Sequence, residues 1–173
     1  MLTFTPNQNL PITSDLDAFE AEIGYKLPRD YRTFLLKFNT DWPEYPETDD
    51  DDLSLGFEVP QDVQADIGKD SFLFNAFNEL TLNPNDYGLL QIYKTTTQDW
   101  GHLPELLPFA RTAGGTHIFI CLADTNIGGI YIASYEYSNK RELGLDLSVE
   151  DYCKIAPSFT AFMEILKWSN PFS

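Results

Sequence analysis

The sequence has few cysteines, few basic residues and no long apolar run. Two cysteines among 173 residues, Cys121 and Cys153, are too few for a disulfide-stapled scaffold. No apolar run approaches the roughly 18 residues that a membrane-spanning helix needs. The first residues also lack the basic and apolar regions of a signal peptide. We therefore expect a cytoplasmic protein that does not bind membranes.

The shortage of basic residues restricts the choice of partner. Lys and Arg number 11 against 27 Asp and Glu, which gives a formal net charge of −16. A chain this acidic repels the phosphate backbone, so we expect no direct binding of nucleic acid. A basic protein partner is favoured, because opposite electrostatic fields speed association. Solubility alone is the other explanation for the charge.

Motifs for catalysis, cofactors or metals are also missing. His102 and His117 are not spaced as zinc ligands, and we expect both to be structural or surface residues. Aspartates 49–52 resemble the start of a calcium loop, but Leu55 and Gln61 stand where an EF-hand needs Gly and Glu. Weak, non-specific cation binding at these aspartates stays open. We expect no enzymatic activity, no cofactor and no specific metal site.

The acidic residues concentrate in one stretch. Residues 41–70 carry eleven acidic residues against Lys69 alone, a net charge of −10. Because like charges repel and stay solvated, we expect an exposed loop over 40–56, within an acidic insertion over about 40–70. Aromatic residues beside acidic ones are typical of binding surfaces. The predicted partner-binding residues are Trp42, Glu44, Tyr45, Glu47, Asp49, Asp50, Asp51 and Asp52. The alternative is a solvated loop with one aromatic residue in the core.

The spacing of apolar residues predicts helices near both ends of the chain. Apolar side chains recur at i, i+3 and i+7 over about 15–23, where Ser14 reads as the N-cap. A second helix is predicted over about 28–38, and Pro28 suits its first position because proline has no N–H to leave unpaired. The same spacing predicts a closing helix over about 158–168.

The middle of the chain reads mainly as antiparallel strands. Residues 106–110 and 118–122 form apolar runs separated by a glycine turn, and 130–137 continues as the next arm of a hairpin. Residues 70–82 fit either a strand or a short helix, and 88–93 fit either a strand or a loop. Two helices, a mostly antiparallel sheet and one further helix make an α+β fold.

Four segments resemble, in the same order, the motifs of one known family. Residues 23–39 are similar to its xLPxDYxxFLxxxN signature, and 155–162 resemble its closing A-x-SFxxFL helix. Between them lie 107–110, followed by the glycine pair 114–115, and the strand 129–132. The chain thus resembles the SUKH superfamily, the SMI/KNR-type proteins similar to cell-wall-synthesis regulators, which include many bacterial immunity proteins.

This resemblance implies a fold and a role. The fold would be a mostly antiparallel sheet packed by two N-terminal helices and one C-terminal helix, in a single domain over 1–173. The role, in bacteria, would be to bind and neutralise a cognate toxin, often a nuclease, whose basic cleft an acidic surface can fill. The alternative is a non-enzymatic scaffold or regulatory protein-binding module of the cell-wall-synthesis-regulator type. An enzyme is the third reading, and would need a polar cluster in a pocket.

Overall fold

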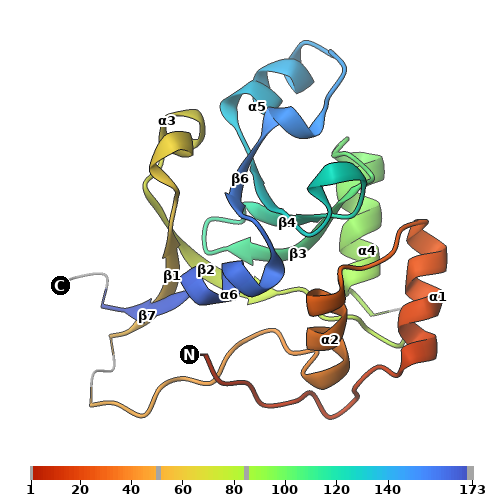
Figure 1. Cartoon of the computed structure of the whole chain (residues 1–173), viewed down its shortest axis with the longest axis vertical. Helices are drawn as coiled ribbons and strands as arrows, with labels where there is room; N and C mark the ends of the chain where they lie inside the picture. The colour runs from red at the N-terminus through yellow and green to blue at the C-terminus, as the bar shows by residue number, and fades with distance from the viewer. Residues whose placement is uncertain (1, 50–51, 84–85, 171–173) are drawn as a thin grey trace.

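The computed structural model describes residues 2–49, 52–83 and 86–170. Within them, seven strands form one sheet in the order β6-β5-β4-β3-β2-β1-β7, and every neighbouring pair is antiparallel (Figure 1). The strands are β1 (Ser54–Glu58), β2 (Ser71–Phe77), β3 (Leu106–Thr112), β4 (His117–Cys121), β5 (Ile130–Ala133), β6 (Tyr152–Ala156) and β7 (Lys167–Ser169).

The helices are short and lie mostly between strands. The α-helices are α1 (Thr13–Ile23), α2 (Arg29–Lys37), α3 (Gln64–Ile67), α4 (Leu89–Lys94), α5 (Tyr135–Glu142) and α6 (Phe159–Ile165). Single turns are η1 (Gln61–Val63), the π-helical η2 (Thr95–Asp99), η3 (Asp124–Asn126) and η4 (Val149–Asp151). The predicted α+β class is confirmed. Within the described residues, no helix combines the length and the apolar character that crossing a bilayer requires.

Local chemistry sets the ends of α1 and α2. The Asp15 carboxylate accepts a hydrogen bond from the Ile12 N–H at 2.8 Å and so closes the first turn of α1. The residue before the helix is therefore Ile12, and the expected cap at Ser14 is wrong. Gly24 ends α1 with a φ of 80°, a left-handed conformation that costs glycine little. Pro28 lies one residue before α2 rather than at its first position.

A buried carboxylate holds the corner between α1 and α2. The Glu20 side chain is only 3% exposed, and it accepts a hydrogen bond from the Leu27 N–H at 3.0 Å. Lys26 and Arg32 reach the same carboxylate at 2.7 and 2.8 Å, and Arg32 also pairs with Asp17 at 2.8 Å. Glu20 and Asp17 therefore each have a basic partner within hydrogen-bond distance.

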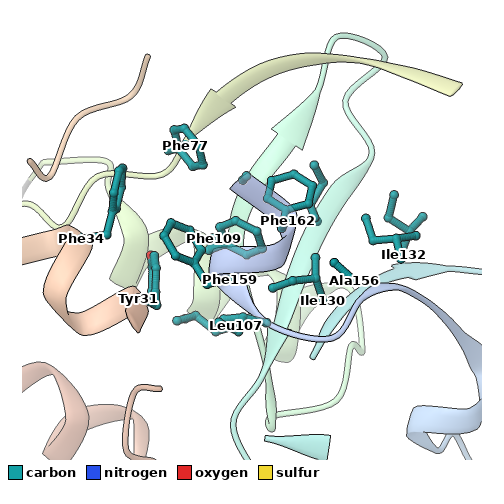
Figure 2. Packing of buried hydrophobic residues seen from close by; sticks show 14 of the residues in the cluster. Tyr31, Phe34, Phe77, Leu107, Phe109, Ile130, Ile132, Ala156, Phe159 and Phe162 are labelled. Carbon is teal, nitrogen blue, oxygen red and sulfur yellow. The ribbon is translucent and has the colours of Figure 1, made fainter. Parts of the chain in front are cut away.

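The main core lies between one face of the sheet and helices α1, α2 and α6. Figure 2 shows Tyr31 and Phe34 of α2 meeting Phe109 of β3 and Phe159 and Phe162 of α6. Ring centroids in this group are 5.1 to 5.7 Å apart. Burying an aromatic ring of this size contributes about 1.5–3 kcal/mol. The residues of the SUKH-like sequence motifs thus form the core.

A second cluster covers the opposite face of strands β3 to β6. Phe119, Tyr137 and Tyr152 are buried there, and the imidazole of His102 lies between the two tyrosine hydroxyls. Its Nδ1 is 2.9 Å from the Tyr152 hydroxyl, and its Nε2 is 3.2 Å from the Tyr137 hydroxyl. Burial lowers the pKa of His102 to about 4, so the ring is neutral at pH 7. This imidazole joins α5 and β6 to the segment before β3.

Two predicted strand assignments are wrong. The strand expected over 130–137 ends at β5, because Ser134 caps α5 by accepting a hydrogen bond from the Tyr137 N–H at 3.3 Å. The segment 88–93, expected as a strand or a loop, is mostly helix α4. Leu89, Ile92 and Tyr93 are its buried residues, a helical spacing that a short apolar run does not separate from a strand.

The end of the chain also differs from the prediction. The helix expected over 158–168 is confirmed only as α6, which Ser158 caps through the Ala161 N–H at 3.1 Å. The chain then extends and forms β7, which pairs with β1. Strand β6 is not among the predicted elements. The segment 70–82, which fitted either a strand or a short helix, contains the strand β2. These strands are fixed by pairing with distant segments rather than by their own sequence.

Candidate functional site

The predicted partner-binding residues lie in one segment beside the edge of the sheet. We call residues 41–53 the acidic loop. Asp50 and Asp51 lie outside the described residues. The exposed loop expected over 40–56 is wrong at its end, since β1 begins at Ser54 and Leu55 is fully buried in the core. Burial of alternate apolar side chains of β1 outweighs the local repulsion between charges.

Two aromatic residues of the acidic loop pack on the edge strand. The ring of Trp42 is 5.8 Å from that of Phe74 in β2 and 5.8 Å from that of Trp168 in β7. Tyr45 meets Trp168 from the other side, with centroids 5.0 Å apart, and remains 45% exposed. We call Phe74, Trp42, Trp168 and Tyr45 the aromatic row. It runs from the core to the surface, so Tyr45 presents a supported ring to solvent.

Trp168 is a residue of this site that sequence reasoning missed. The helical spacing of Phe159, Phe162 and Leu166 predicts a helix over about 158–168, which includes Trp168 at its end. Instead it stands opposite Leu55 in the antiparallel pairing of β1 with β7. Only the three-dimensional pairing of segments far apart in the chain brings it to the acidic loop.

Hydrogen bonds hold both ends of the acidic loop. At its start, the Phe77 N–H donates to the backbone carbonyl of Asp41 at 2.8 Å. At its end, the Leu53 N–H donates to the hydroxyl of Tyr45 at 3.1 Å. The Tyr45 ring therefore has two roles: it packs on β7, and its hydroxyl closes the loop.

The carboxylates of the acidic loop point into solvent. All five described acidic residues of the loop are exposed: Asp41, Glu44, Glu47, Asp49 and Asp52. The Thr5 hydroxyl donates a hydrogen bond to Glu44. In the described part of the chain, the ion pairs include none of Asp41, Glu44, Glu47 and Asp49. The loop therefore presents negative charge that these basic side chains do not neutralise.

A large cleft lies elsewhere and has no evident chemistry. Its volume is about 1250 Å³, and it is lined by the β1–β2 hairpin, Ile155 of β6 and parts of β7. Lys69 at its rim lies over the ring of Phe72, 5.1 Å from the centroid. Among residues 2–49, 52–83 and 86–170, no three His, Cys, Asp or Glu side chains are grouped to hold a metal ion. The acidic loop remains the best candidate site.

A sheet packed by helices, with an acidic and aromatic loop at its edge, defines an α+β domain suited to binding proteins. The family model of SMI1/KNR4 (SUKH-1) matches residues 13–165, from the start of α1 to the end of α6, and the chain belongs to this family. The SUKH resemblance of the sequence motifs is thereby confirmed. No curated protein matches the chain.

Family membership narrows the function to two related roles. It indicates either an immunity protein or an SMI1/KNR4-type regulatory protein. The family is generally non-enzymatic, and its members typically bind protein partners. The partner and the surface that meets it are the questions that follow.

Proposed function

We propose that this chain is a cytoplasmic immunity protein that binds and neutralises a basic protein toxin. A nuclease fits best, because an enzyme that holds phosphates needs a basic cleft, which a carboxylate-rich surface can occupy. The observation that carries the proposal is the acidic loop, whose exposed Glu47 and Asp49 have no ion pair among the described residues.

The acidic loop has the properties of a preorganised binding surface. Interfaces gain most of their affinity from a few aromatic or Arg anchors, and Tyr45 offers a half-exposed ring backed by Trp168. The hydrogen bond from the Leu53 N–H to the Tyr45 hydroxyl holds this side chain in place, which reduces the entropy that Tyr45 loses on binding. The carboxylates would then raise the association rate and align the partner.

A pull-down from the native strain, at low and moderate salt, tests the proposal. The bait is this chain, or a variant in which the acidic loop loses three charges: Glu47→Gln, Asp49→Asn and Asp52→Asn. A matched control removes three exposed charges near α5: Glu136→Gln, Glu142→Gln and Asp146→Asn. The natural chain and the control should recover one basic toxin domain, which the loop variant loses and rising salt releases. If neither the loop substitutions nor the higher salt concentration reduces recovery of the toxin domain, the role of the loop is refuted.

The alternative is a scaffold or regulatory module of the SMI1/KNR4 type. The family match favours it as a second candidate, because it covers the fold without distinguishing the two roles. The pull-down separates them, since a regulatory module would recover several proteins with no common basic domain. Gene order separates them too: a large toxin gene immediately upstream supports the immunity role.

A further inference from the structure

Strands β6 and β7 form the two edges of the sheet. At one edge, the turn η1 contacts β6. At the other edge, β7 pairs with β1 through Lys167, Trp168 and Ser169. No backbone hydrogen bond joins the outer side of β7 to any described segment. An open strand edge is a template for another extended chain.

The open edge is continuous with the acidic loop. Trp168, the middle residue of β7, contacts both Trp42 and Tyr45 of the loop. Lys167 and Ser169 flank it, and their side chains are exposed. Because side chains alternate between the faces of a strand, Trp168 projects on one face and its two neighbours on the other. Backbone groups, an aromatic row and carboxylates thus meet at one place.

We propose that β7 accepts an extended basic segment of a partner protein, which adds to the sheet as a further strand. Alternate residues of that segment would share the face of Trp168, where Arg or Lys side chains can lie against the aromatic row and reach the carboxylates of the acidic loop. This inference rests on the proposed function for the charge of the partner, and it adds how the partner is recognised.

Charge argues against a second copy of this chain as the occupant. Pairing of two β7 edges would bring two acidic loops together, and each molecule carries a formal net charge of −16. Like-charged surfaces placed side by side repel. A basic segment has no such penalty, and its main-chain groups supply the same hydrogen bonds.

Three short peptides test the proposal on the full chain. One is Arg-Thr-Arg-Thr-Arg, and the second is the same peptide with the amides of its three central residues N-methylated, which keeps the charge but removes hydrogen-bond donors from both edges. A third, Glu-Thr-Glu-Thr-Glu, reverses the charge. The measurements are the dissociation constant by NMR titration and the hydrogen-exchange rates of the Lys167, Trp168 and Ser169 amides.

The unmethylated basic peptide should bind at least about tenfold more tightly than the methylated one, as expected for the loss of two hydrogen bonds. It should also slow exchange of the outward-facing amides of β7. Equal binding of both basic peptides, without protection of β7, would overturn strand addition and leave the acidic surface of the proposed function intact. Equal binding of the basic and acidic peptides would overturn both.

Discussion

Two acidic regions of this molecule use the same side chains in opposite ways. At the corner between α1 and α2, Glu20 is buried and receives Lys26, Arg32 and the Leu27 N–H. Burial by itself disfavours the ionised carboxylate, but these partners together lower the pKa of Glu20 below its ordinary value. The carboxylate there is part of the structure, because it accepts a hydrogen bond from the Leu27 N–H, which is buried.

In the acidic loop, the carboxylates that the structure describes are exposed. Glu47 and Asp49 have no ion pair within the described residues, while Lys94 and Lys140 are paired with acids elsewhere. The difference teaches that the total charge does not locate a binding surface. What distinguishes the acidic loop is that exposed carboxylates without an ion pair lie beside the half-exposed ring of Tyr45.

The largest expected effect is the difference in stability between two variants, each of which removes one carboxylate from one of the two regions. Glu20→Ala should lower the free energy of unfolding by about 2–3 kcal/mol, because it leaves the buried Leu27 N–H without its acceptor and removes the hydrogen bonds to Lys26 and Arg32. Glu47→Ala should change it by no more than about 0.5 kcal/mol, as is usual for exposed positions. Urea unfolding at pH 7 measures both. A similar loss in the two variants would break the comparison.

The sequence allowed the helices α1, α2 and α6 to be predicted, but not α3, α4 or α5. Apolar residues at helical spacing locate α1, α2 and α6, since each helix buries one stripe against the sheet. The density of charge and the two aromatic residues at 42 and 45 also led to the acidic loop. That its carboxylates contact a partner remains a prediction.

The other elements could not be predicted from the local sequence, because they depend on contacts between different segments of the chain. Residues 158–168 are predicted as one helix from the spacing of Phe159, Phe162 and Leu166, yet pairing with Leu55 draws Trp168 into β7. Tyr135 and Tyr137 alternate like strand residues, but the cap at Ser134 starts α5 there. In both cases a tertiary contact or a single hydrogen bond decides between two local patterns that the sequence supports equally.

The pH dependence of the free energy of unfolding tests the role of the buried carboxylates, once the contribution of His102 is known. Burial, and next the charges of His117 and Arg141, lower its pKa from 6.5 to about 4. Between those values the unfolded chain binds a proton that the folded chain does not, so stability falls as the pH drops. From pH 7 to 5 the free energy of unfolding should decrease by about 2 kcal/mol from this residue.

The variant His102→Gln isolates that effect. It should reduce the decrease between pH 6.5 and 4, measured by urea unfolding at half-unit steps, and what remains there includes His117, whose pKa burial also lowers. The decrease in the free energy of unfolding that remains below pH 4.5 then comes from carboxylates whose pKa is lowered in the folded chain, chiefly Glu20 and Asp151. Their contribution to stability is lost as they are protonated. If the slope above pH 5 is unchanged in the variant, His102 is not the group that titrates.

The smallest expected effect concerns how the acidic loop is held. Tyr45→Phe keeps the ring against Trp168 but removes the hydroxyl that accepts from the Leu53 N–H. The free energy of unfolding should fall by about 0.5–1 kcal/mol, and the Leu53 amide should exchange faster. Tyr87→Phe, at a tyrosine that is 69% exposed, is the matched control and should change neither. An unchanged exchange rate of the Leu53 amide would mean that the packing of Tyr45 on β7, rather than its hydroxyl, holds this side chain. The site would then differ from the corner at Glu20, where hydrogen bonds hold the structure.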